Sequence, residues 1–214
     1  MKDLQNYRKS YDKNQLLEID LPQNPIDLFQ KWFAEVEQQG GIEEVNAMSI
    51  ASIGLDNFPK TRVVLLKQVI DEGFLFYTNY NSEKGQAISN NPNVCLSFFW
   101  PNLERQVIIK GVASRVSSEV SDQYFLSRPI GSQLGAIVSN QSTIIESREI
   151  LEQKLTTLTT EFESKTPTRP DNWGGFMVHG ISFEFWQGRP NRLHDRIRFS
   201  NFNNNAWQID RLAP

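Results

Sequence analysis

The feature that most constrains the fold is a series of short apolar runs, rich in branched and aromatic residues, that turn signals separate. These runs are typical of β-strands and cover residues 47–53, 61–69, 74–78, 94–100, 106–116, 173–186, 196–199 and 206–209. We expect the first three to be successive antiparallel strands, with a turn at Asp71-Glu72-Gly73, and the last two to form a hairpin around Asn203-Asn204-Asn205. Six or more strands with short helices between them predict a closed or nearly closed antiparallel barrel, because closure removes exposed strand edges.

Helical patterns lie before and between these strands. We expect helices from Pro25 to Gly40, over 83–89 behind a Ser82 cap, from Ser117 to Pro129, over 133–138 behind a Ser132 cap, and along Leu151, Leu155, Leu158 and Phe162. The predicted fold class is therefore mainly β with peripheral helices (α+β).

The length of 214 residues, with 39% hydrophobic content, fits one globular domain. The first residues are polar with scattered aromatic and leucine side chains. We therefore expect a mobile N-terminal arm over 1–20, which orders on a ligand or partner, and a single domain over 21–214.

Composition and charge exclude several classes of protein. A net charge of −3 argues against a nucleic-acid binder. The single cysteine, Cys95, rules out an internal disulfide, lies in an apolar run and is best interpreted as a buried hydrophobe. We expect no metal site. The N-terminus has no apolar core and no stretch approaches the roughly 18 apolar residues of a membrane span, so we expect a cytoplasmic protein without membrane contact.

The sequence has no general catalytic motif, but several polar groups stand where anions bind well. Arg62 and Lys67 bracket an apolar strand, and their odd spacing points them to opposite faces. Lys84 lies in the first turn of the helix that Ser82 caps, where free N–H groups favour an anion. Solvated strand ends and an ordinary capped helix are the alternatives for these two segments.

Tyr124, Arg128 and Ser132 are spaced four apart, which would place them on one face of a continuous helix. Pro129 interrupts that helix, so Ser132 is expected to cap the next one, where it and Arg128 could still meet at a phosphate. Separate surface roles are the alternative. Gln141 and Ser142 are polar groups just past that helix, and by themselves they do not indicate a site.

The segment 185–196 combines three arginines, a histidine and an acid beside Trp186. Arginines flanking His194 favour its neutral form, and Asp195 is placed to orient one of them. Such charge density favours a functional loop over a structural one.

These segments resemble the pyridoxamine/pyridoxine 5′-phosphate oxidases. The resemblance rests on Arg62 to Lys67, Leu103-Glu104-Arg105-Gln106, Ser127-Arg128-Pro129, Phe185-Trp186-Gln187-Gly188, Arg192-Leu193-His194-Asp195-Arg196 and the C-terminal Ile209-Asp210-Arg211-Leu212-Ala213-Pro214. It covers the chain from about Tyr7 to Pro214 in the expected order. It implies an antiparallel FMN-binding split β-barrel, a homodimer with FMN at the subunit interface, and oxidation of phosphorylated B6 vitamers by oxygen to pyridoxal 5′-phosphate.

The resemblance also implies site residues. For the FMN phosphate it implies Arg62, Lys84 and Ser142, and for the rest of the flavin Val63, Val64, Leu65, Leu66, Lys67, Tyr77, Thr78, Gln106, Gln141, Trp186 and Arg196. For the substrate phosphate it implies Lys67, Tyr124, Arg128 and Ser132, for the substrate ring Arg192, Leu193 and His194, and for an arm closing over the substrate Arg8, Lys9, Ser10 and Tyr11.

In this interpretation the substrate gives a hydride from C4′ to flavin N5, and the phosphate clamp fixes the distance between them. Arg192 and His194 are the catalytic candidates, because they would position and polarise the substrate, and Arg196 would stabilise the reduced flavin. Many family members have a basic residue where this chain has Glu83, so one phosphate contact is expected to differ.

Three other functions stay open at this point. A flavin or nicotinamide-dependent reductase would share the fold but would not need Tyr124, Arg128 and Ser132 together with Arg192 and His194. A non-catalytic carrier would bind flavin or pyridoxal phosphate without turnover. A plain interaction domain would bind no flavin.

Overall fold

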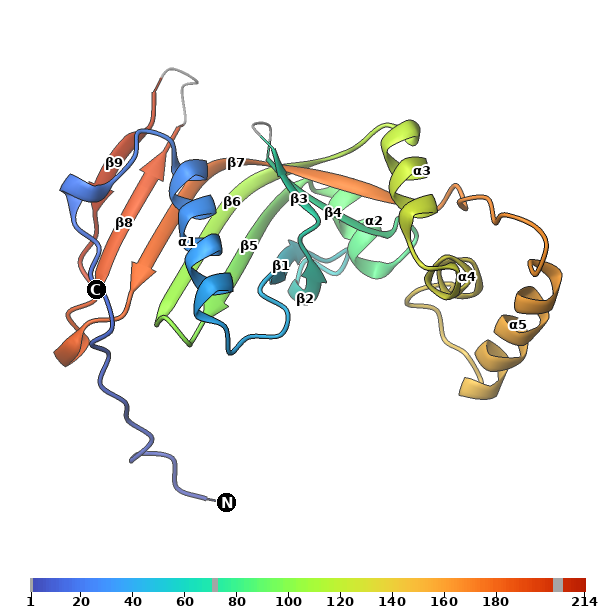
Figure 1. Ribbon diagram of the computed structural model, residues 1–214, viewed down its shortest axis with the longest axis horizontal. Helices are drawn as coiled ribbons and strands as arrows, with labels where there is room; N and C mark the ends of the chain where they lie inside the picture. The colour runs from blue at the N-terminus through green and yellow to red at the C-terminus, as the bar shows by residue number, and fades with distance from the viewer. Residues whose placement is uncertain (1, 71–72, 202–205) are drawn as a thin grey trace. The chain divides into compact units, whose positions relative to one another are not determined.

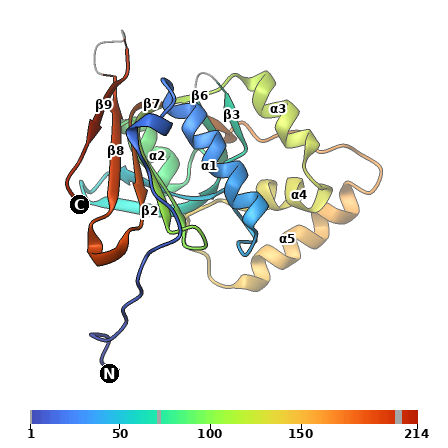
Figure 2. The same cartoon turned by 60° about the vertical axis from the view of Figure 1, so that its left-hand side comes forward.

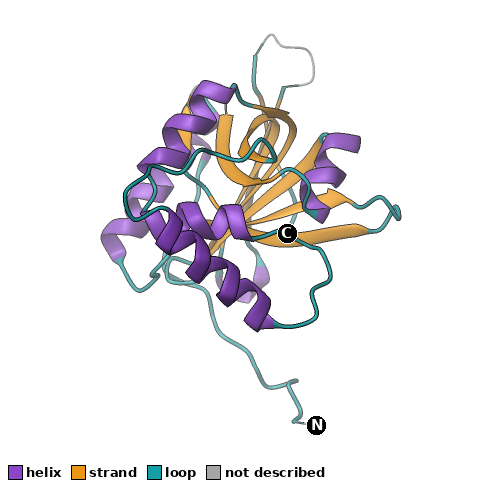
Figure 3. Ribbon diagram, turned by 90° about the vertical axis from the view of Figure 1, so that its right-hand side faces the viewer, coloured by secondary structure: helices purple, strands orange, loops and turns teal. Residues whose placement is uncertain are grey.

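A computed structural model describes residues 2–70, 73–201 and 206–214 (Figure 1). The helical elements are η1 (Glu18–Asp20), α1 (Pro25–Gln39), α2 (Glu83–Asn90), α3 (Ser118–Ser127), α4 (Ile130–Val138), α5 (Arg148–Glu161) and η2 (Pro190–Arg192). The strands are β1 (Ala47–Ile53), β2 (Pro59–Leu65), β3 (Gln68–Ile70), β4 (Gly73–Asn79), β5 (Asn93–Trp100), β6 (Arg105–Arg115), β7 (Trp173–Gln187), β8 (Asp195–Ser200) and β9 (Gln208–Arg211). Figure 3 distinguishes the strands, in orange, from the helices, in purple.

The strands form a sheet in the order β2-β1-β5-β6-β7-β4-β3, with β8 added to β7 and β9 to β8. The pairs β3/β4, β4/β7, β7/β8 and β8/β9 are antiparallel. The antiparallel split-barrel fold class that the sequence predicted is therefore confirmed. The two predicted turns, at residues 71–72 and 203–205, lie outside the described residues.

The expected single strand over 61–69 is wrong, because the chain breaks it into two. β2 ends at Leu65 and β3 begins at Gln68, and the two strands occupy opposite ends of the sheet order. Two residues span at most about 7–11 Å, so the ends of the sheet must come close together. β2 also contacts β4, which confirms the predicted near-closure. The sequence did not reveal the break because Leu66, which lies in it, is apolar like the strand residues before it, and is buried.

The predicted helices are present, with one correction at Ser132. α4 begins at Ile130 behind Pro129, so Ser132 lies in its first turn and is not the cap. The N–H of Ser132 donates to the carbonyl of Pro129 at 2.8 Å. The final hairpin is confirmed, although β9 covers Gln208–Arg211 and not 206–209.

The described chain divides into two compact units. Unit 1 comprises Met1–Ser49, Cys95–Gly111 and Gly180–Pro214, and unit 2 comprises Ile50–Val94 and Val112–His179. The predicted arm over 1–20 and single domain over 21–214 stay predictions. Among the described residues, none of the helices is long and apolar enough to cross a membrane.

The core of unit 1 is aromatic. Phe29 on α1 packs on Phe98 with ring centroids 5.0 Å apart, and Trp32 packs edge-on against Phe185 at 5.3 Å. α1 lies beside the strands β7 and β8 in Figure 2. Each fully buried phenylalanine side chain contributes about 1.5–3 kcal/mol, so the helical spacing of the α1 aromatics accounts for its docking.

The core of unit 2 includes a cross-strand pair on β4 and β7, where Phe76 stacks on Phe176. Gly73 starts β4 with φ +146°, and a Cβ there would lie 2.1 Å from the carbonyl oxygen of Val178, so only glycine fits. α4 and α5 contact each other, and no residue of α5 is fully buried.

Candidate active site

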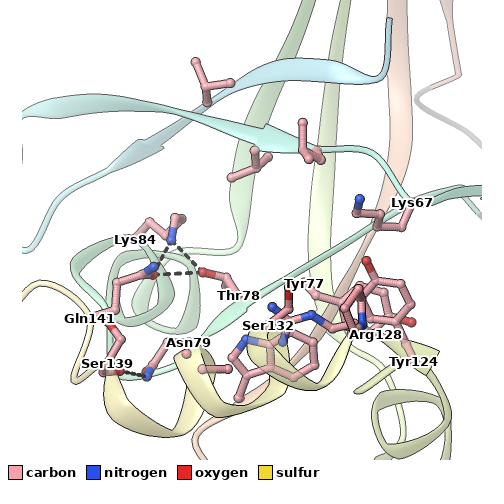
Figure 4. A pocket seen from close by; sticks show the side chains of 17 residues that line it. Lys67, Tyr77, Thr78, Asn79, Lys84, Tyr124, Arg128, Ser132, Ser139 and Gln141 are labelled. Atoms are coloured by element: carbon pink, nitrogen blue, oxygen red, sulfur yellow. Dashed lines mark hydrogen bonds between the residues drawn. The ribbon is translucent and has the colours of Figure 1, made fainter. Parts of the chain in front are cut away.

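Unit 2 contains a cavity of about 650 Å³ between β2, β4, α2, α3 and α4. Predicted site residues that line it are Val63, Val64, Leu65, Lys67, Tyr77, Thr78, Lys84, Tyr124, Arg128, Ser132 and Gln141. Figure 4 shows Lys84, Thr78 and Gln141 gathered at one end and Tyr124, Arg128 and Ser132 at the other. The sequence segments that seemed separate thus form two polar ends of one cavity.

Lys84 forms the first end. Ser82 caps α2 by accepting the N–H of Gly85 at 3.2 Å, which places Lys84 in the first helical turn. The Lys84 ammonium donates to Thr78 Oγ1 at 2.5 Å and to Gln141 Oε1 at 2.7 Å. Burial, and secondarily the charge of Arg62, lowers the pKa of Lys84 to about 8. Lys84 is therefore a half-buried cation whose neighbours in these two contacts are uncharged acceptors.

Arg62 and Ser142 meet Lys84 at the start of α2. The N–H of Glu83 donates to Ser142 Oγ at 3.2 Å. Arg62 Nη2 lies 2.6 Å from Glu83 Oε2, and Arg62 lines a small pocket together with Lys84. The structure thus brings together the three residues that the resemblance implied for one phosphate.

Lys60 also belongs to this cluster, and sequence reasoning missed it. Its ammonium pairs with Glu83 and lies 3.2 Å from Asp56 Oδ2. A hydrogen bond from Lys60, and secondarily its charge, lowers the pKa of Glu83, so this carboxylate stays ionised. Lys60 is two residues before Arg62, which places both on one face of β2. That spacing was a usable signal.

Arg128 forms the opposite end of the cavity. It is the C-cap of α3, and its guanidinium lies 4.8 Å from the ring centroid of Trp173. Its Nη1 is buried and has no hydrogen-bond partner. Burial lowers the pKa of Arg128 from its ordinary value, although the group remains a cation. A buried unsatisfied donor is costly, so this atom calls for an anionic ligand.

Aromatic stacking holds this end in place. Tyr77 stacks on Tyr124 with centroids 3.8 Å apart, and on Trp173 at 5.5 Å. Burial, and secondarily Tyr124, raises the pKa of Tyr77 to about 12, so it stays a neutral phenol. Sequence reasoning missed Trp173 as a site residue. Its place beside Asn79 comes from the β4/β7 register, which no local pattern reveals.

Leu66 and Lys67 complete the predicted strand segment. Leu66 is buried in the core, whereas Lys67 lies in the break between β2 and β3 and faces the cavity. The N–H of Lys67 donates to the carbonyl of Leu75 at 2.8 Å, which fixes the backbone there. Arg62 lines the smaller pocket beside Lys84 and not the main cavity. Because the strand breaks between Leu65 and Gln68, the alternation that predicted opposite faces for Arg62 and Lys67 does not apply across it.

Unit 1 gathers a second group of predicted residues. His194 lies 4.7 Å from Trp186, and Tyr11 lies 5.7 Å from each of these rings. The N–H of Arg189 donates to His194 Nδ1 at 3.0 Å, which leaves the proton of the neutral ring on Nε2. Burial, then Arg192, lowers the pKa of His194, while Asp195 opposes them. His194 is thus a neutral imidazole with a fixed tautomer.

The other predicted residues of unit 1 are more dispersed. Arg196 donates to Glu184 Oε1 at 2.8 Å and to the carbonyl of Ala213 at 2.7 Å. Gln106 contacts Ser97 Oγ at 3.4 Å. Arg192 has φ +62° and Leu193 is exposed. Lys9 pairs with Glu104, Arg8 contacts the carbonyl of Gln5, and Ser10 is exposed.

The antiparallel split barrel, and a cavity with cations at both ends, are typical of the class of FMN-binding split-barrel proteins. The chain belongs to the pyridoxamine 5′-phosphate oxidase family. The family model for pyridoxamine 5′-phosphate oxidase matches residues 34–161, and the model for the pyridoxine 5′-phosphate oxidase C-terminal dimerisation region matches residues 173–214.

Relatives and solved structures agree with this assignment. The chain is 64% identical over 214 residues to a pyridoxine/pyridoxamine 5′-phosphate oxidase of Flavobacterium psychrophilum, with full coverage of both chains. It is 54% identical over 213 residues to the oxidase of Christiangramia forsetii, covering 100% of this chain and 99% of that one. The structure of PhzG from Burkholderia lata, in complex with tetrahydrophenazine-1-carboxylic acid, superposes with a TM-score of 0.88 at 25% identity, covering 96% of this chain and 100% of that one. An FMN-binding protein of Nostoc punctiforme shares the fold, with a TM-score of 0.69 at 12% identity and coverage of 87% and 97%.

Proposed function

We propose that this chain is an FMN-dependent oxidase that converts pyridoxamine 5′-phosphate and pyridoxine 5′-phosphate to pyridoxal 5′-phosphate with oxygen. Hydrogen peroxide is released, and ammonia is released from the amine. The observation that carries this proposal is the cavity of unit 2, which presents cationic groups at both ends and a buried, unsatisfied Arg128 donor at one of them. Two phosphate-bearing ligands account for both ends, and the names of the relatives support the same pair.

The residues at the α2 end fit the phosphate of FMN. Arg62, Lys84 and Ser142 supply two cations and a hydroxyl at a helix N-terminus, where the helix dipole also favours an anion. Thr78 and Gln141 are positioned beside Lys84 to hydrogen-bond the flavin. A volume of about 650 Å³ lies within the range of about 300–1,000 Å³ that is common for cofactor pockets.

The residues at the opposite end fit the phosphate of the vitamer. Arg128 offers its free Nη1, Ser132 lies in the first turn of α4, and Tyr124 and Lys67 line the same space. Binding the phosphate of the vitamer restricts where its ring, and so its reacting carbon, can lie. The phosphate-binding residues thereby contribute to the rate without touching the reacting carbon. FMN, when bound, supplies the hydride acceptor and the reaction with oxygen.

The family resemblance assigns polar groups of unit 1 to the substrate ring. His194 is neutral with a proton on Nε2, so it is a hydrogen-bond donor at that atom. Arg192 adds a positive charge that would polarise the substrate. Arg196, oriented by Glu184 and the carbonyl of Ala213, supplies a fixed charge for the flavin ring. We further propose a homodimer with FMN at the interface, supported by the match to a dimerisation region. The cytoplasmic location stays a prediction.

An oxygen-electrode assay of the FMN-supplemented protein with each phosphorylated vitamer tests the proposal. We expect oxygen uptake matched by the absorbance of pyridoxal phosphate. A flavin-loaded protein without oxygen uptake would contradict the oxidase assignment and favour a reductase, which nicotinamide-dependent assays would then identify.

A further inference from the structure

The carboxylate of Glu104 holds the N-terminal arm. Its Oε2 accepts the backbone N–H groups of Asp12 and Lys13 at 3.0 and 3.2 Å, and its Oε1 lies 3.0 Å from the Lys9 ammonium. The Glu104 side chain is only 1% exposed. A buried carboxylate is costly unless it is paired and hydrogen-bonded, and here the two hydrogen bonds to Oε2 and the ion pair at Oε1 all come from the arm. Burial alone would raise the pKa of Glu104, but the contacts with Lys9, Lys13 and Asp12 together, including the charge of Lys9, lower it.

A second carboxylate holds the arm further along. The N–H of Leu16 donates to Asp195 Oδ2 at 3.0 Å, and Arg189 donates to the carbonyl of Asn14 at 3.1 Å. These contacts use the backbone of the arm, as the Glu104 contacts to Asp12 and Lys13 do. Figures 1 and 2 show the arm, in blue, passing next to the loop between β7 and β8. Residues 12–16 are therefore fixed to the remainder of unit 1 at two independent points, Glu104 and the segment from Arg189 to Asp195.

The backbone at Glu104 is strained, which indicates that its side chain has a specific role. Glu104 has φ +58°, a left-handed conformation that favours glycine or asparagine. Its carbonyl accepts the N–H of Gly188 at 2.8 Å. A Cβ on Gly188 would lie 2.8 Å from Tyr11 Cβ and 3.0 Å from Glu104 Cβ. Glu104, Gly188 and Tyr11 therefore form one tightly packed point.

This packed point determines where the Tyr11 ring lies. Tyr11 contacts Trp186 edge-on and His194 at a tilt, each with centroids 5.7 Å apart. Asp12, which Glu104 holds, is the next residue in the chain. Release of Asp12 and Lys13 would free Tyr11 to leave the histidine.

We propose that Glu104 is a positioning residue, which attaches the arm through the backbone of Asp12 and Lys13 and so keeps Tyr11 against His194. This inference rests on the proposed function only for its consequence in turnover, because the attachment itself needs no substrate.

Amide hydrogen exchange of the full-length protein, without substrate, tests the attachment. The variant Glu104→Gly suits the left-handed backbone and removes the carboxylate. We expect the Asp12 and Lys13 amides to exchange at least about tenfold faster, because each loses a hydrogen bond to a charged group. The Leu16 amide, held by Asp195, should change less. Glu104→Gln, which keeps an acceptor oxygen, should have a smaller effect. Unchanged exchange at Asp12 and Lys13 would overturn the proposal.

A kinetic cycle separates positioning from a merely structural role. We expect Glu104→Gly to raise KM for the phosphorylated vitamer about tenfold and to change kcat less than about threefold, because the arm binds and does not react. If Glu104 acts through Tyr11, Glu104→Gly should raise KM little further in a protein that already carries Tyr11→Ala. An equal rise in both backgrounds would contradict action through Tyr11.

Glu152→Gln is the matched control, because it removes an exposed carboxylate that pairs with Arg148 on α5. It should leave both the exchange and KM unchanged. Faster exchange in a protein with no oxidase turnover would support the attachment while the proposed function failed. Oxidase turnover with unchanged exchange would reject the attachment alone.

Discussion

Arg105 and Arg196 of unit 1 differ from Arg128 of unit 2 in whether an acidic partner neutralises them. In unit 1, Arg105 pairs with Glu35 and Arg196 with Glu184. In the cavity of unit 2, Arg128 has no acidic partner among the described residues, and its Nη1 is unsatisfied. A paired cation stabilises the fold, whereas a buried cation with a free donor marks a place for an anionic ligand. The free donor of Arg128 therefore makes this end of the cavity the proposed site of a ligand phosphate.

Substitution of Arg105 should give the largest effect on stability. Arg105 is 6% exposed, pairs with Glu35, donates to Gln187 and lies over the Trp32 ring. We expect Arg105→Ala to lower the free energy of unfolding by about 3 kcal/mol, because it breaks a largely buried ion pair. Urea denaturation measures this, with Arg148→Ala as an exposed control expected to cost less than about 0.5 kcal/mol. If Arg105→Ala left the stability unchanged but weakened FMN binding, Arg105 would be a ligand-binding cation, which contradicts the assignment of paired cations to the fold.

The pH dependence of FMN binding should report Lys84. An anion favours the charged ammonium, and the pKa of Lys84 is about 8 in the free protein. FMN affinity should therefore fall as pH rises above 8, by up to about tenfold per pH unit. Quenching of flavin fluorescence measures it, and Lys84→Arg should remove the dependence because arginine stays charged.

Stability of the FMN-free protein should change in the opposite direction. The folded pKa of about 8 lies below the ordinary value of 10.5, so the unfolded chain binds more protons between them. The contribution of Lys84 to stability therefore rises with pH across that window. Parallel trends in stability and affinity would argue against Lys84 as the group that titrates.

Substitution of Trp173, whose ring lies under Arg128, should have a smaller effect on substrate binding. Trp173→Phe keeps an aromatic ring but weakens the cation–π contact, and we expect KM for the phosphorylated vitamer to rise about threefold, in line with about 0.5–1 kcal/mol for such contacts. Steady-state kinetics with unphosphorylated pyridoxine should show no matching change. Equal losses for both substrates would mean that Trp173 does not act through the phosphate clamp.

Substitution of Glu83 should give an equally small effect. It pairs with both Lys60 and Arg62, so Glu83→Gln removes a negative charge from the proposed FMN phosphate site. We expect FMN to bind about threefold more tightly at low salt, with a smaller gain at high salt, because the pairs are partly exposed and screened. Glu163→Gln, an exposed acid on another segment, is the control. Weaker FMN binding would show that Glu83 is needed to orient Arg62.

Local chemistry explains what was predictable from the sequence. The strand over 47–53 and the Ser82 cap follow from period-two burial and from a side-chain hydrogen bond, which involve neighbours in the sequence. The break at Leu66-Lys67 did not follow, because barrel closure imposes it. Trp173 was missed as a site residue because only the register of β4 and β7 places it beside Asn79. Lys60 was missed because it joins the site through its ion pair with Glu83. The family resemblance supplied the ligands, and the structure placed their residues within each unit.

The Arg128 end of the cavity is the proposed site of the substrate phosphate. The most direct measurement is kcat/KM for pyridoxine 5′-phosphate and for pyridoxine, with the wild-type protein and with Arg128→Ala. We predict that the substitution lowers kcat/KM for the phosphorylated substrate on the order of 100-fold, as expected for lost charge-assisted hydrogen bonds, and leaves the unphosphorylated one nearly unchanged. Equal losses for both substrates would contradict the claim.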